Sequence, residues 1–261
     1  MSFFPILDVL NVSGYTTLAN FPPNNWQNNY SEPLFIYLTY LKDATWHSEK
    51  LGILKNGELR TFYSNEFKSL VVDGEIPLLS LSMNPLPIES KSLPRPKIPV
   101  TDAPLWRGTL GLKSKTTTTS YQGELPIFPS QGSLLSFAPF LQFGQTIENF
   151  VLLVNITNDP VHNASEVEIY NANNKILLGS REIFSNKINI IQLDDFGFNE
   201  NDLPVISCRN MSALPLYFSK TKDGSSMSIE HTHAPMSMVT HGDRFGAQKH
   251  IKDLWFSDLK K

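Results

Sequence analysis

The sequence predicts an all-β protein made of two tandem antiparallel β-sandwich modules, followed by a short C-terminal α-helix. Three observations predict this fold. Short apolar runs alternate with turns rich in Pro, Gly and Asn, a series of landmarks recurs in the second half, and helical periodicity is confined to the C-terminus. Strands spaced by about ten residues, with turn signals between them, are typical of sandwiches.

The strands are predicted from apolar runs and from alternation. Residues 34–41 and 150–156 are aromatic and β-branched runs, and each is expected to form a buried central strand, the second as the counterpart of the first. Residues 166–170 alternate polar and apolar side chains, as a half-exposed strand does, and 171–174 form an Asn-rich turn. Further strands are expected at 175–178 and 188–193.

The internal repeat predicts that the two modules arose by duplication. The same number of residues separates Gly52 from Pro77 and Gly179 from Pro204. Self-similarity in a fixed order is the sequence signature of a repeated unit. The landmarks are Leu51-Gly52, Ile76-Pro77, Leu86-Pro87 and Ala103-Pro104 in the first copy, and Leu178-Gly179, Leu203-Pro204, Leu214-Pro215 and Ala234-Pro235 in the second.

We expect the first module at residues 1–112, the second at 113–241, and the helix at 242–261. The Thr-rich stretch 113–120 is the predicted boundary, and it reads equally well as an exposed strand or a linker. The longer spacing between the central strand and Leu178 predicts one extra edge strand in the second module. One larger sandwich or barrel, and a pseudo-symmetric pair packed face to face, are the alternatives.

The C-terminal segment carries the helix signal. Asp243 is a suitable N-cap for a helix over 244–259, in which apolar residues recur at steps of three and four. We expect this helix to pack on the second module or on a partner subunit.

Composition excludes several classes of protein. The chain has 261 residues, 41% hydrophobic and 18% charged, and a net charge of −3, so it lacks the basic surface that nucleic acids or anionic membranes require. The single cysteine, Cys208, lies in an apolar run and is expected to be buried rather than reactive. With no internal disulfide and no signal or membrane-spanning segment evident, we predict a cytoplasmic protein.

The strand pattern resembles that of immunoglobulin-like and fibronectin-III-like sandwiches. The resemblance lies in the pattern of short strands and turns, because the Cys…Trp…Cys hallmark of true immunoglobulin domains is absent. It implies a sandwich for each module and implies no activity.

The histidines near the end of the second module form a candidate metal site. His231 and His233 would project to one face of a strand, and His241 and His250 follow. Three or four neutral imidazoles suit zinc, copper or iron. The alternative is a set of ordinary turn or surface histidines, since the first copy has Asp102 where the second has His233.

A second candidate site is a loop in the first module. Asn25, Trp26, Gln27 and Tyr30 combine carboxamides with two aromatic rings, as carbohydrate-binding surfaces do. The alternative is a polar loop whose aromatic rings pack back onto the core.

We therefore predict a non-enzymatic binding or assembly protein, and homo-oligomerisation through the helix or the sandwich faces is left open. Carbohydrate binding and metal binding, the latter with or without catalysis, are the two alternatives. The chain lacks a nucleophile elbow, a phosphate loop and a dinucleotide-binding motif, so no catalytic residues are assigned and no cofactor other than such a metal is expected.

Overall fold

The computed structural model describes residues 3–21, 33–71, 74–97, 108–123, 125, 127–138, 141–231 and 244–259. Its strands are β1 (Phe4–Pro5), β2 (Ser13–Ala19), β3 (Leu34–Lys42), β4 (Thr45–Leu54), β5 (Leu59–Tyr63), β6 (Leu78–Ser82), β7 (Glu89–Ser90), β8 (Gly108–Lys113), β9 (Thr118–Gly123), β10 (Leu134–Phe137), β11 (Ile147–Val154), β12 (Ala164–Asn171), β13 (Ile176–Phe184), β14 (Ile188–Gln192), β15 (Pro204–Cys208), β16 (Leu214–Thr221) and β17 (Met227–His231). The helical elements are the 3-10 turns η2 (Ser64–Glu66) and η3 (Leu193–Phe196) and the helix α1 (Arg244–Asp258).

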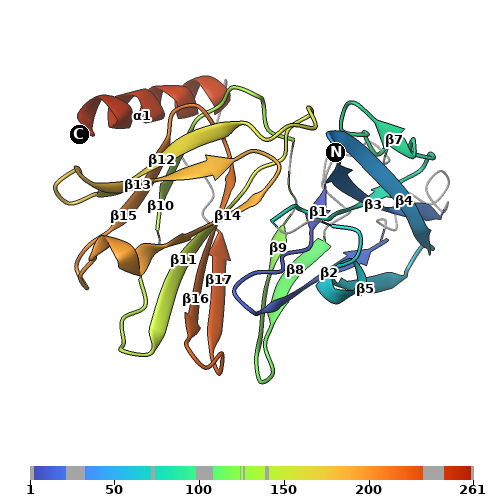
Figure 1. Ribbon diagram of the computed structural model, residues 1–261, viewed down its shortest axis with the longest axis horizontal. Helices are drawn as coiled ribbons and strands as arrows, with labels where there is room; N and C mark the ends of the chain where they lie inside the picture. The colour runs from blue at the N-terminus through green and yellow to red at the C-terminus, as the bar shows by residue number, and fades with distance from the viewer. Residues whose placement is uncertain are drawn as a thin grey trace.

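The described strands form four antiparallel sheets, two in each half of the chain (Figure 1). The first half has the orders β1-β6-β3-β4-β7 and β5-β2-β8-β9, and the second has β10-β15-β12-β13 and β14-β11-β16-β17. The predicted all-β fold with a short C-terminal helix is confirmed.

The two halves share one topology. When β7 is left out, the other described strands of the first half correspond in chain order to β10–β17. Corresponding strands have corresponding neighbours: β1-β6-β3-β4 matches β10-β15-β12-β13, and β5-β2-β8-β9 matches β14-β11-β16-β17. This agreement is a property of the fold, whereas its origin in a duplication stays a prediction.

The Leu-Gly landmark marks the same irregularity in both halves. In the first half, Ile36 pairs with Gly52 and the next residue pairs with Lys50, so Leu51 is left out of the ladder. In the second, Ile169 pairs with Gly179 and the next residue with Leu177, so Leu178 is left out. A β-bulge of this kind inserts one residue and bends the strand. The recurring sequence therefore reflects a recurring backbone feature.

Two expectations about the repeat are wrong. The run 150–156 belongs to β11, whose counterpart is β2 and not β3. The extra edge strand is β7, which pairs with β4 and lies in the first half. The third landmark also differs, because Leu86-Pro87 precedes β7 while Leu214-Pro215 opens β16. The fourth lies outside the described residues. Spacing alone misled because hairpins of unequal length shift the numbering between counterparts.

Each half has its own hydrophobic core between its two sheets. Ile36, Leu38 and Leu79 belong to the core of the first half. Val151, Leu153 and Ile206 belong to that of the second, together with the buried Cys208. The expectation that Cys208 packs as a small hydrophobe agrees with this burial.

A third core lies between the halves. It joins Trp46 and Leu78 of the first half to Phe150, Leu152 and Phe218 of the second. Alternate residues of β11 therefore face two different cores, which explains its uninterrupted apolar run. The indole Nε1 of Trp46 also donates to the carbonyl of Asn158, at 3.1 Å, so a hydrogen bond accompanies the apolar contact.

Pairing in the first half extends beyond the predicted boundary at residue 112. β9 pairs with β8 in the first-half sheet, and its Thr-rich sequence forms a largely exposed strand. Ser114 Oγ in the β8–β9 turn donates to the carbonyl of Gly224, at 2.7 Å, and so contacts the second half.

Helix α1 lies over the second half (Figure 1). The Trp255 ring meets the Phe137 ring of β10 edge-on, with centroids 4.8 Å apart. Leu259 is buried with Tyr170 and Val205. The helix covers the outer face of the β10-β15-β12-β13 sheet.

Candidate functional site

The residues singled out from the sequence lie largely outside the described part of the chain. This holds for Asn25, Trp26, Gln27 and Tyr30 of the loop, and for His233 and His241. His231 is the last residue of β17, opposite Leu216 of β16. His250 is exposed on α1. Within the described ranges, no group of three His, Cys, Asp or Glu residues is placed to hold a metal ion.

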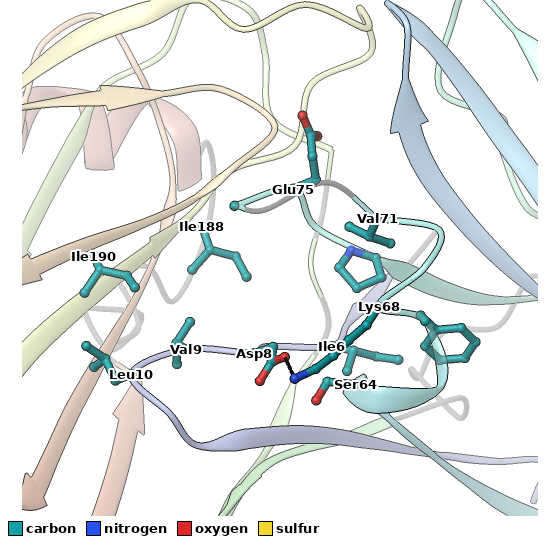
Figure 2. A pocket seen from close by; sticks show the side chains of 13 residues that line it. Ile6, Asp8, Val9, Leu10, Ser64, Lys68, Val71, Glu75, Ile188 and Ile190 are labelled. Atoms are coloured by element: carbon teal, nitrogen blue, oxygen red, sulfur yellow. Dashed lines mark ion pairs between the residues drawn. The ribbon is translucent and has the colours of Figure 1, made fainter.

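The structure instead points to a pocket where the two halves meet. Its volume is about 370 Å³. Three segments that are distant in sequence form it: residues 6–10 after β1, residues 64–71 and 74–77 between η2 and β6, and β14 of the second half (Figure 2). Pockets of this size that lie between structural units are common sites for small ligands.

The pocket is lined by apolar side chains from both halves and, in about equal measure, by polar groups. Ile6 and Phe67 are buried in the first-half core, and Ile188 and Ile190 of β14 approach from the opposite side (Figure 2). Leu10 stands beside them at a two-residue turn in which the residues on either side, Val9 and Val12, exchange backbone hydrogen bonds.

The turn at Leu10 is strained. Leu10 has φ 54° and Asn11 has φ 61°, a left-handed conformation that costs a non-glycine residue of order 1 kcal/mol or more. The strain is tolerated because the side chain of Leu10 packs against the core between the halves. One wall of the pocket is thus held in a fixed conformation.

Polar groups gather at the end of the pocket formed by the first half. Lys68 Nζ lies 3.1 Å from Asp8 Oδ2, and Figure 2 shows this ion pair with the hydroxyl of Ser64 close by in the view. Ser64 is only 4% exposed, and its Oγ has no hydrogen-bond partner within the described chain. A buried hydroxyl without a partner is unfavourable by about 1–3 kcal/mol.

A second polar contact joins the halves beside the pocket. His162 Nε2 lies 2.7 Å from Glu75 Oε1, and His162 Nδ1 lies 2.8 Å from the carbonyl oxygen of Ser185. The side chain of Glu75 is 9% exposed, and its Oε2 is buried without a partner. Figure 2 shows its carboxyl group turned away from Asp8 and Lys68. Burial raises the pKa of Glu75, while His162 and Lys187 oppose this effect.

The protonation of this contact follows from its geometry. A carbonyl oxygen only accepts, so His162 Nδ1 must donate to Ser185. The contact between His162 Nε2 and Glu75 Oε1 then requires one proton, carried either by the imidazole nitrogen or by the carboxyl oxygen. Both ring nitrogens are therefore engaged, and His162 has none left to act as a general base or a metal ligand. The pair connects the halves and has the geometry of a structural contact.

Comparison with known proteins adds no assignment. No protein-family model, curated protein or solved structure matches the chain. No helix in the described residues is both long and apolar enough to cross a lipid bilayer. What the protein does must therefore be argued from its own side chains.

Sequence reasoning missed the pocket because no local pattern marks it. Asp8, Ser64 and Ile188 are ordinary residues in their own segments and meet only after folding. One weak signal was present, since Asp8 interrupts an otherwise apolar N-terminal stretch. A charge in a buried segment indicates a polar partner or a ligand.

Proposed function

We propose that this protein is a non-enzymatic binding protein whose ligand is a small molecule held in the pocket between the two β-sandwich halves. The observation that carries the proposal is the composition of the pocket. Apolar side chains from both halves lie beside convergent polar groups, among them one ion pair, and a concave site that combines apolar contact with a few placed polar groups is the usual form of a ligand site.

The shared core supports a preformed site. Because Phe150 and Phe218 are buried against the first half, the two sides of the pocket are held by the same packing that stabilises the fold. A ligand that enters such a site pays little to order it, so a modest contact area is enough for binding.

The test is a small-molecule screen by ligand-observed NMR, with Ile190→Trp as the blocking variant. Ile190 lines the pocket and is 44% exposed, so a larger ring is expected to fill the opening without disturbing the core. Ile176→Trp is the matched control, because Ile176 is 50% exposed and does not line the pocket.

We expect compounds that bind the wild type with Kd below about 1 mM, retain this affinity in Ile176→Trp and lose it in Ile190→Trp. If every compound that binds is indifferent to Ile190→Trp, the pocket is not the binding site. A screen that yields no ligand for the wild type would contradict the proposal as a whole.

Carbohydrate binding is a second candidate, favoured by the outer face of the β5-β2-β8-β9 sheet. A Cβ atom on Gly111 would lie 2.1 Å from Cζ of Tyr15, so the glycine leaves room for this ring over the sheet. The Tyr63 ring is 6.2 Å away, and Thr17 and Thr61 pair their hydroxyl groups beside it. Aromatic rings with a polar edge, next to hydroxyl groups, suit a sugar. Glycan-array binding that Tyr63→Ala and Trp26→Ala leave unchanged would exclude this face and the predicted loop.

A further inference from the structure

The charged side chains at the polar end of the pocket form a matched pair. Asp8 and Lys68 come from different segments, and their charged atoms are 3.1 Å apart. Glu75 is the remaining charged residue among the described lining, and it is turned toward His162 instead. A ligand therefore meets one negative and one positive charge side by side.

This arrangement discriminates between ligand charges. A lone ammonium group drawn to Asp8 is repelled by Lys68 at nearly the same distance, and a lone carboxylate drawn to Lys68 is repelled by Asp8. A molecule with adjacent opposite charges interacts favourably with both. The selection is one of specificity more than of strength, because both side chains are partly exposed to water.

The unpartnered hydroxyl of Ser64 fits the same kind of molecule. A serine hydroxyl is both a donor and an acceptor, so it can donate to a carboxylate or accept from an ammonium group. This oxygen is buried without a partner, so a rotation of the Ser64 side chain toward the pocket would let a ligand complete its hydrogen bond. The remaining lining, including Phe67, Val71 and Ile188, offers apolar contact to an uncharged side chain.

We propose that the pocket binds a small zwitterion with an apolar side chain, of the kind represented by an apolar α-amino acid. The proposal rests on the pocket being the binding site of this protein. In such a molecule the ammonium and carboxylate groups are attached to one carbon atom, so their charges lie close enough to meet Asp8 and Lys68 together. The pocket volume of about 370 Å³ is large enough to admit one molecule of this size.

The test compares leucine with two analogues that each lack one charge, 4-methylpentanoate and 3-methylbutylamine, and with the uncharged 4-methylpentanamide. Affinities are measured by titration with NMR detection on the wild-type chain. We expect leucine to bind at least about tenfold more tightly than each analogue. We also expect Asp8→Asn to abolish the preference for leucine over 4-methylpentanoate, and Lys68→Met to abolish the preference over 3-methylbutylamine.

A charge-exchanged double variant, Asp8→Lys with Lys68→Asp, controls for loss of structure. It keeps one charge of each sign, so the preference for leucine is expected to return even where the single variants have lost it. Equal binding of all four compounds, or tighter binding of the uncharged amide, would overturn the ligand class while leaving the pocket as the binding site. Failure of all four to bind would overturn the ligand class alone, because the pocket could still bind another compound in the screen, whereas binding indifferent to Ile190→Trp would count against both the ligand class and the pocket as the binding site.

Discussion

The contact between Glu75 and His162 predicts that the stability of the protein falls as the pH rises above 4.5, the ordinary pKa of the Glu75 carboxyl. Burial raises the pKa of the Glu75 carboxyl, so folding favours its protonated form. A group whose pKa is raised on folding stabilises the folded state below its unfolded value of 4.5, and this contribution is lost as the pH rises through the folded value. The geometry agrees, because the contact requires one shared proton that is lost at high pH.

The magnitude follows from the buried atoms. Once the shared proton has gone, lone pairs of His162 Nε2 and Glu75 Oε1 face each other, and Glu75 Oε2 is also buried without a partner. An unsatisfied buried group costs about 1–3 kcal/mol. The Glu75→Gln variant keeps the shape of the side chain and can donate an amide N–H to the neutral imidazole. It should recover about 1–3 kcal/mol relative to the wild type at pH 8, and less at pH 5.

The assay is urea unfolding of the wild type and Glu75→Gln at pH 5, 6.5 and 8, at constant ionic strength. Glu148→Gln is the matched control, because Glu148 pairs with Lys220 at 2.6 Å, away from the contact between Glu75 and His162. The difference in the free energy of unfolding between wild type and variant is expected to change with pH for Glu75→Gln and to stay constant for Glu148→Gln. Parallel curves for wild type and Glu75→Gln would refute the reasoning.

Four further outcomes are expected. Ser64→Ala raises the free energy of unfolding by about 1 kcal/mol and weakens ligand binding. Ser207→Ala removes another buried unpartnered hydroxyl and is expected to raise the free energy of unfolding without changing ligand binding. Urea unfolding measures the stability, and ligand titration measures the affinity. Trp255→Ala costs about 2 kcal/mol, because the half-buried ring packs on Phe137, and makes the C-terminal helix more susceptible to limited proteolysis. Leu152→Ala lowers the free energy of unfolding by about 2–5 kcal/mol. In calorimetry the variant is expected to unfold in one transition at a lower midpoint temperature, because the core between the halves couples them. Separate transitions for each half would contradict this coupling. Elemental analysis of untagged protein tests the predicted metal site, and a metal content below about 0.1 ion per chain would exclude that site.

Much of the secondary structure was predictable from local pattern. The run at 34–41 forms most of β3, and the predicted helix over 244–259 corresponds to α1. The segment at 166–170 lies within β12, but its expected half-exposure is wrong, because Glu168 and Tyr170 are buried and Tyr170 packs with residues of α1. These signals succeed because burial on one face or two imposes a period on the sequence of each element separately. The pairing of strands has no such period, and the counterpart of β3 was therefore misassigned.

The candidate site was beyond prediction for the same reason. The predicted site residues were chosen because chemically suggestive side chains lie close together in sequence, as in His231 and His233. The pocket unites Asp8, Ser64 and Ile188, which no spacing rule connects. The contact between Glu75 and His162 likewise joins two halves of the chain.

By itself, the sequence determined the β-rich composition, the positions of the main strands, the terminal helix and the burial of Cys208, because each depends on the polarity of neighbouring residues. The tertiary structure decided which strands pair, that β11 is buried on both faces, and that two sandwiches share a core with a pocket at its edge. These features arise from contacts between distant segments, whose free energy is gained only once the chain has closed the loops between them.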